Sequence, residues 1–178
     1  MLYAQVETGQ GYLAKIEEES FVDGEGVRCS VYVSGCPFAC AGCYNVAAQK
    51  FKYGTPFTDE TLTQILDACA PDYIAGLSLL GGEPFCNIDI IQPLIEAFRA
   101  RFGHTKTIWV WSGFMFENLK HNTKARKELL KQIDVLVDGP FIEDKKDLTL
   151  AFRGSSNQRI IDIKNTLTSD KLILYNGY

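Results

Sequence analysis

The chain has 178 residues, of which 46% are hydrophobic, and carries a net charge of −4 at pH 7. This length suits one globular domain with a well-buried core, so we predict a single domain over residues 1–178. Acidic and basic residues are interspersed, which argues against nucleic acid or a membrane surface as the main partner. The sequence has no signal-peptide pattern at its start and no apolar run near the ~18 residues of a membrane span. We therefore expect a cytoplasmic protein.

From residue 27 onward, strand-like and helix-like segments alternate, which predicts an α/β fold with a parallel sheet. We expect strands at residues 27–34, 74–80, 107–111, 134–137 and 159–163, with a further candidate at 171–175. Apolar residues at helical spacing predict helices at residues 59–70, from 88 onward, and at 124–132. No repeat or linker interrupts this order, which agrees with a single domain.

Six cysteines are present, and they are expected to be reduced thiols, some of them bound to metal. Three of them, Cys36, Cys40 and Cys43, lie within eight residues directly after the first predicted strand. They supply one ligand fewer than the four that hold iron–sulfur clusters and structural zinc, which indicates a metal site with one open position. An alternative is a zinc site with Cys29 as fourth ligand, although Cys29 lies inside a strand and the usual paired spacing is absent.

Three other unusual segments also follow predicted strands. They are Gly81-Gly82-Glu83-Pro84, Ser112-Gly113 and Asp138-Gly139-Pro140. In parallel α/β folds the carboxyl ends of the strands meet on one side, where barrels and open sheets bind ligands. We expect these segments and the cysteines to form one site. Because a closed eight-fold barrel needs ~250 residues, the chain can form only a partial, open barrel with a wide lateral mouth.

The spacing of Cys36, Cys40 and Cys43 resembles that of the radical S-adenosylmethionine (SAM) superfamily. In that superfamily three cysteines hold a [4Fe–4S] cluster and SAM chelates the fourth iron, so the resemblance implies an open (β/α) barrel of the radical SAM type. Gly81-Gly82-Glu83 is similar to the superfamily's GGE element, which holds the amino group of SAM. An ammonium suits carbonyl and carboxylate acceptors, and each charge-assisted bond contributes about 1.5–3 kcal/mol.

The other expected contacts with SAM are less specific. Ser112 and Asp138 could meet its ribose hydroxyls or its carboxylate, although a Ser or an Asp before Gly is as often a turn residue. Tyr44 could pack on the adenine or cover the cluster. Gly42 stands where many relatives have an aromatic residue, so the expected contact with adenine there is made by the backbone of Gly42, Cys43 and Tyr44.

Further segments indicate which family within the superfamily the chain resembles. Residues 23–28, Asp-Gly-Glu-Gly-Val-Arg, resemble the D-G-x-G-x-R entry of glycyl-radical-enzyme activases, with Glu25 where proline is frequent. Residues 111–114, 137–141 and 153–159 are similar to the family of anaerobic ribonucleoside-triphosphate reductase activating proteins. The similarity spans residues 23–163, and the family often has His where Phe38 stands. The sequence assigns no role to residues 153–159.

The resemblance implies an oxidoreductase that cleaves SAM at a [4Fe–4S] cluster and generates a glycyl radical on the large subunit of the anaerobic (class III) ribonucleoside-triphosphate reductase. A flavodoxin or ferredoxin is the implied electron donor, and no catalytic side chain is expected beyond the ligands of the cluster and SAM. Alternatives are an activase of another glycyl radical enzyme such as pyruvate formate-lyase, or a compact radical SAM enzyme of the deazaguanine pathway. A non-catalytic iron–sulfur or zinc protein is an alternative of another class.

Overall fold

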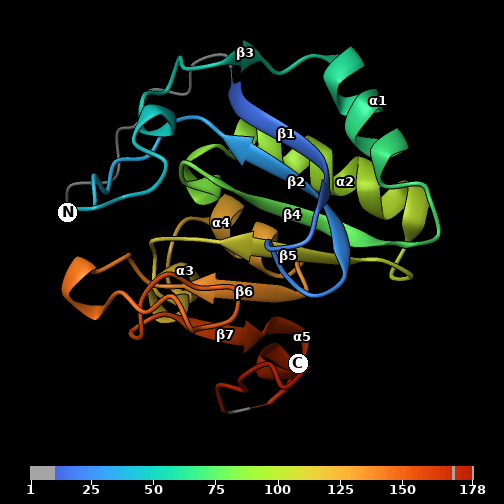
Figure 1. Cartoon of the computed structure of the whole chain (residues 1–178). Helices are drawn as coiled ribbons and strands as arrows, with labels where there is room; N and C mark the ends of the chain where they lie inside the picture. The colour runs from blue at the N-terminus through green and yellow to red at the C-terminus, as the bar shows by residue number, and fades with distance from the viewer. Residues whose placement is uncertain (1–10, 170, 178) are drawn as a thin grey trace.

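The computed structural model describes residues 11–169 and 171–177, so residues 1–10, 170 and 178 of the predicted single domain lie outside it. The described chain is a mixed α/β structure around one seven-stranded sheet with the order β3-β1-β2-β4-β5-β6-β7 (Figure 1). The strands are β1 Tyr12–Ser20, β2 Val27–Val33, β3 Thr55–Pro56, β4 Ile74–Gly81, β5 Thr107–Trp111, β6 Val135–Asp138 and β7 Arg159–Asp162. The helices are α1 Asp59–Ala68, α2 Ile88–Phe102, α3 Phe116–Lys120, α4 Lys124–Leu130 and α5 Ile163–Thr168.

The four central strands, β2, β4, β5 and β6, run parallel, as the alternation of elements predicted. The expectation of a parallel sheet does not hold at the two sides of the sheet, because β1 is antiparallel to β2, β3 is antiparallel to β1, and β7 is antiparallel to β6. Among the described residues the edge strands β3 and β7 do not pair with each other, so the sheet is not closed.

The structure also contains strands and helices that were not predicted. They are β1, β3, α3 and α5. Residues 171–175, expected as a possible strand, contribute only one isolated antiparallel bridge, between Leu174 and Ile161. No helix among the described residues has both the length and the apolar character needed to cross a membrane.

The two faces of the sheet have different covers, because successive side chains of a strand point to opposite sides. The helices cover one face, where β2 and β4 contribute Cys29, Val31, Val33, Leu77 and Leu79 to a core that includes Ile65 of α1 and Leu94 of α2. The opposite face carries a smaller apolar cluster of Trp109, Val135, Val137 and Ile160, on which Phe152 and Tyr175 pack. Burial of each large apolar side chain contributes roughly 1.5–3 kcal/mol.

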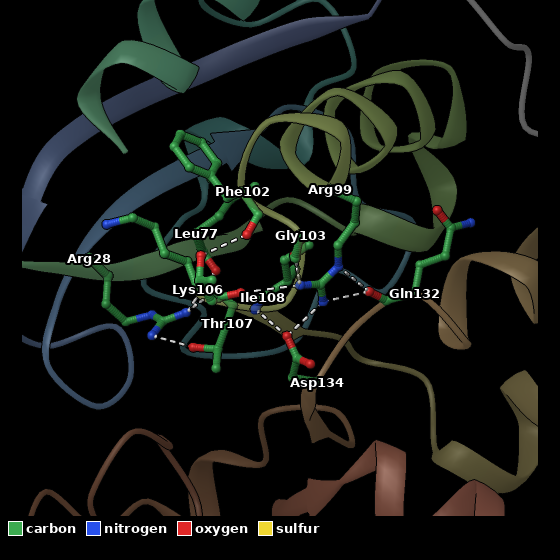
Figure 2. A network of polar contacts seen from close by, with 11 residues as sticks. Arg28, Leu77, Arg99, Phe102, Gly103, Lys106, Thr107, Ile108, Gln132 and Asp134 are labelled. Atoms are coloured by element: carbon green, nitrogen blue, oxygen red, sulfur yellow. Dashed lines mark hydrogen bonds and ion pairs between the residues drawn. The ribbon is translucent and has the colours of Figure 1, made fainter. Parts of the chain in front are cut away.

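Toward the amino ends of the strands, polar contacts join the elements (Figure 2). Arg28, the last residue of the Asp-Gly-Glu-Gly-Val-Arg segment, is 1% exposed and donates to Ser78 Oγ at 2.7 Å and to the Thr107 carbonyl at 2.9 Å. Arg99 of α2 donates to the Asp134 carboxylate, which lies just before β6, at 2.7 Å. These contacts fix that side of the sheet, and the cysteine loop follows the opposite, carboxyl ends of the strands.

Candidate functional site

The segments that follow β2 and β4 are joined by backbone hydrogen bonds. The Gly82 amide donates to the Val33 carbonyl at 2.7 Å, and the Glu83 amide donates to the Gly35 carbonyl at 2.9 Å. The side-chain amide of Asn87 donates to the carbonyls of both Gly35, at 3.1 Å, and Glu83, at 2.9 Å. The start of the cysteine loop is therefore held against the Gly-Gly-Glu segment.

A cavity of about 800 Å³ lies beside these strand ends. It is lined by nine of the ten residues predicted for the site, namely Cys36, Cys40, Gly42, Cys43, Tyr44, Gly81, Gly82, Glu83 and Ser112. Asp138 is not among the described lining residues, although Gly139 is. The structure thus brings the cysteines and the Gly-Gly-Glu segment to one cavity, as the strand order predicted.

The cysteine loop presents thiols that are partly buried. All six cysteines are free. Burial raises the pKa of the Cys36 thiol to about 12 and also raises the pKa of Cys40, so both are protonated in the absence of a metal. Binding of iron must therefore displace these protons, as metal binding to thiols does in general. Gly42 has a φ of +69°, and a Cβ atom there would lie 2.8 Å from the carboxylate carbon of Glu143. The positive φ therefore favours glycine at this turn.

The position of Cys29 does not fit the zinc alternative. Cys29, the proposed fourth ligand, is fully buried in the core between the sheet and the helices. A hydrogen bond with the Cys69 thiol, together with burial, raises the pKa of Cys29. Cys29 and Cys69 are therefore core residues.

Glu83 links the end of β4 to the segment after β5. Its side chain is 1% exposed, and its carboxylate accepts hydrogen bonds from the Phe85 amide at 3.0 Å, the Ser112 hydroxyl at 2.9 Å and the Gly113 amide at 2.7 Å. Burial raises the pKa of Glu83 to about 7, against the opposing effect of these hydrogen bonds and of Arg126. A cationic ligand near this carboxylate would favour its charged form. The predicted contacts of Glu83 and Ser112 with SAM stay predictions.

Asp138 has partners within the protein. It is fully buried, and its carboxylate accepts from Arg159 Nε at 3.0 Å, from Arg159 Nη2 at 2.5 Å and from the Phe116 amide at 2.8 Å. These bonds join the end of β6 to β7 and to the first residue of α3. The structure therefore gives Asp138 a positioning role that the sequence did not indicate, and its predicted contact with SAM stays a prediction.

The side chain of Tyr44 is 97% exposed. Its predicted packing on the adenine or over the cluster stays a prediction.

Residues 139–158 form the part of the wall that sequence reasoning missed. This segment returns from β6 to β7, and it lines the cavity with Phe141, Lys146, Leu148, Arg153 and Gln158, among others. Its side-chain functions could not be read from the sequence, because the only signal was a polar turn of Gly, Ser, Asn and Gln with flanking arginines. Residues 153–159, left without a role above, therefore border the site.

Comparison with known proteins agrees with this arrangement. A family model described as a 4Fe-4S single cluster domain matches residues 22–161, which include all three cysteines of the loop. A protein of Pasteurella multocida (strain Pm70) named anaerobic ribonucleoside-triphosphate reductase-activating protein is 41% identical over 143 residues, covering 78% of this chain and 89% of that protein. The chain belongs to this activating-protein family.

Other activating proteins of the same name are similarly related. That of Escherichia coli (strain K12) is 40% identical over 141 residues, covering 77% of this chain and 89% of that protein. That of Enterobacteria phage T4 is 37% identical over 142 residues, covering 79% of this chain and 86% of that protein. The resemblance to the activating-protein family is thus confirmed, as is the presence of a 4Fe-4S domain.

Proposed function

We propose that this member of the activating-protein family is a radical SAM activase, built as a single domain over residues 1–178 with an open (β/α) barrel of the radical SAM type. Cys36, Cys40 and Cys43 hold the [4Fe–4S] cluster. The observation that carries this proposal is the shared cavity, in which three thiols and the Gly-Gly-Glu segment lie together at the carboxyl ends of parallel strands. Three thiol donors leave one iron of a four-iron cluster open for SAM.

When bound, the reduced cluster supplies one electron for cleavage of SAM to methionine and a 5′-deoxyadenosyl radical, which removes a hydrogen atom from a glycine of the partner enzyme. The protein binds, orients and shields these groups. Carbonyls of Gly81 and Gly82 and the Glu83 carboxylate accept from the ammonium of SAM, and Ser112 holds the Glu83 carboxylate in place. Gly42, Cys43 and Tyr44 lie beside the adenine.

The proposed partner is the large subunit of the anaerobic ribonucleoside-triphosphate reductase. The names of the relatives support this proposal, because they give the anaerobic reductase as the target of those proteins. A flavodoxin or ferredoxin in the cytoplasm supplies the electron. The cavity is bordered by Phe21 and Val22, whose side chains are 70% and 73% exposed. An apolar rim of this kind suits the entry of a protein loop better than a closed pocket for a small molecule would.

The test is anaerobic reconstitution with iron and sulfide, followed by an assay for 5′-deoxyadenosine with dithionite as reductant. We expect SAM cleavage by the native chain and loss of both the cluster absorption near ~400 nm and the cleavage in Cys40→Ala. Cys86→Ala is the matched control, because Cys86 is half-buried beside Arg126 and does not line the cavity. It should keep its cluster and its activity.

The alternative functions predict different results in this assay, or when another substrate or partner enzyme is added to it. A fully loaded cluster that leaves SAM intact would support a non-catalytic iron–sulfur protein and contradict the proposal. Cleavage of SAM together with turnover of a small deazaguanine precursor would favour the small-molecule enzyme. A glycyl radical that forms on pyruvate formate-lyase and not on the reductase would move the activase to another partner.

A further inference from the structure

Positive charge is concentrated at the end of α3 and along α4 (Figure 1). Residues 120–131 contain five of the 18 basic residues of the chain but only one of its 22 acidic residues, Glu128. The whole chain has a net charge of −4, so this segment is opposite in sign to the rest of the molecule. A local excess of one charge attracts partners of the other charge to that part of the surface.

Three lysines of this segment point to solvent. Leu129 and Leu130 of α4 are buried, so the helical repeat directs Lys124 and Lys127 away from the core. Both lysines are exposed, as is Lys120, the last residue of α3. We call Lys120, Lys124 and Lys127 the lysine face.

The acidic residues next to the lysine face are paired with other cations. Glu128 forms an ion pair with Lys131 at 2.9 Å, and Glu117 of α3 forms one with Arg159 at 2.8 Å. Within residues 11–169 and 171–177, no acidic side chain forms an ion pair with the lysine face. Its three charges are therefore available to a partner.

The inner side of α4 lies close to the cysteine loop. The guanidinium of Arg126 lies over the ring of Phe114 at 4.8 Å, and that ring packs edge-to-face on Phe38 at 4.9 Å. Phe38 stands between Cys36 and Cys40 in the sequence. Two side-chain contacts therefore join α4 to the loop that we assign to the cluster.

Arg126 also fixes α4 to the segment after β4. Its Nε donates to the Phe85 carbonyl at 2.8 Å, and its Nη2 donates to Cys86 Sγ at 3.6 Å. The helix that carries most of the lysine face is thus held in place. A partner can dock on such a surface without the cost of ordering it.

The lysine face lies outside the cavity. Among the described residues, none between 114 and 138 lines the cavity. The loop of the reductase is proposed to enter past Phe21 and Val22, which do line it. A protein bound to the lysine face would therefore leave the cavity open to the reductase.

We propose that the lysine face is the docking site of the electron donor, an acidic protein of the flavodoxin class, an inference that rests on the proposed function. One electron passes from the reduced flavin of the donor to the oxidised cluster, and no covalent bond forms or breaks. Complexes between electron-transfer proteins are small and short-lived, and complementary charge speeds their formation. Three exposed cations beside the cluster loop meet this need, whereas a donor docked in the cavity would exclude the reductase.

The experiment measures electron transfer without SAM. The reconstituted chain is reduced, freed of excess reductant and mixed with oxidised flavodoxin, so that one electron returns from the cluster to the flavin through the same docked complex. Electron paramagnetic resonance on rapidly frozen samples follows the loss of the reduced cluster. We expect the rate constant of the native chain to fall as ionic strength rises, because salt screens exposed charges. Lys124→Glu/Lys127→Glu should react about 10- to 100-fold more slowly at low salt.

Lys164→Glu/Lys171→Glu is the matched control, because it makes the same change in net charge at two exposed lysines. These lie in and after α5, which begins beside Asp134 at the amino end of β6, away from the cysteine loop. The control should react with flavodoxin within about 2-fold of the native rate, since distant charges are screened. A small viologen, which needs no docking site, should oxidise the cluster equally fast in all three proteins.

Several results would overturn the inference. They are equal slowing in the two double variants, a native rate that does not depend on ionic strength, and an unchanged rate in Lys124→Glu/Lys127→Glu. Slower oxidation by the viologen in that variant would mean that these lysines support the cluster and do not dock the donor.

Two further results separate the inference from the proposed function. Weaker binding of the reductase to Lys124→Glu/Lys127→Glu, with an unchanged rate with flavodoxin, would assign the lysine face to the reductase and overturn the inference alone. A full cluster that dithionite reduces but that leaves SAM intact would overturn the proposed function, whatever the rate with flavodoxin.

Discussion

The carboxylate of Glu83 accepts a hydrogen bond from the hydroxyl of Ser112 at 2.9 Å, although 29 residues separate them in the sequence. This bond joins the carboxyl ends of β4 and β5 at the cavity. It also brings a buried acid close to the place where a cationic ligand is expected. We therefore expect the free energy of unfolding to change when Glu83 gains or loses its proton.

Glu83 predicts a specific dependence of stability on pH. Burial raises its pKa from 4.5 to about 7, so the folded chain holds the proton more tightly than the unfolded chain does. The contribution of Glu83 to the free energy of unfolding should therefore be greatest below pH 4.5. It should decline by roughly 3 kcal/mol as the pH rises from 4.5 through 7. Glu83→Gln cannot titrate, so this decline should be absent. Urea denaturation of both proteins between pH 5 and 8 measures the difference, and parallel curves would contradict it.

The contact between Gly82 and the cysteine loop predicts a loss of iron in Gly82→Ala. The added Cβ would lie 2.6 Å from the Gly35 carbonyl oxygen, which is a backbone atom just before the first cysteine. Either the loop or β4 must shift, and we expect a loss of about 1–3 kcal/mol in stability together with reduced cluster loading. Iron analysis after reconstitution measures the effect.

Gly103→Ala is the control for this change. Gly103 has a positive φ, of +58°, and no heavy atom lies within 4 Å of an added Cβ. It should lose about 1–3 kcal/mol from backbone strain alone and bind iron normally. Equal iron content in the two variants would show that the close approach of Gly82 is not needed for the cluster.

The ion pair between the buried Asp138 and the partly exposed Arg159 predicts a large effect on stability. Arg159→Gln leaves the fully buried Asp138 carboxylate without its cation, which should cost about 3–5 kcal/mol. The exposed pair of Arg101 and Asp67 is the comparison, and Arg101→Gln should cost about 0–1 kcal/mol. Chemical denaturation gives both values. Similar losses in the two variants would mean that burial of Asp138 adds nothing.

Substitution of Tyr44 is expected to weaken the binding of SAM without changing the stability of the protein. Its side chain is 97% exposed, so Tyr44→Ala should change stability by less than about 0.5 kcal/mol. If the ring packs on adenine, the Kd of SAM should rise about 2- to 10-fold. Tyr73→Ala serves as control, because Tyr73 is 60% exposed and does not line the cavity. An unchanged Kd in Tyr44→Ala would remove the aromatic contact from the site.

The sequence predicted the central strands because their signals are local. β5 was predicted with its observed bounds, and β2 and β4 to within one residue, since apolar runs with glycine or polar ends mark buried parallel strands. β1 was missed because its sequence, Tyr-Leu-Ala-Lys-Ile-Glu-Glu-Glu-Ser, resembles an exposed charged segment. The short β3 pairs only with Tyr12 and Leu13, so the charged part of β1 has a neighbouring strand on one side only. The antiparallel direction of β7 had a signal, because no helix was predicted between residues 139 and 158, and a parallel crossover usually needs one.

The sequence predicted the parts of the site that lie at the ends of strands. It did not predict contacts between side chains that lie far apart in the sequence. Strand order alone brought the cysteines, Gly81 and Glu83 to one cavity. The partner of Asp138 could not be found, because Arg159 is 21 residues away and its direction depends on the antiparallel pairing of β7.

The most direct test of the proposed activity is electron paramagnetic resonance on a mixture of the reconstituted chain, SAM, a reductant and a class III ribonucleoside-triphosphate reductase. The account predicts a glycyl radical signal on the reductase with the native chain and with Cys86→Ala, and none with Cys40→Ala. A reductase that stays without the radical, while the native chain with its full cluster cleaves SAM, would contradict the assignment of this partner.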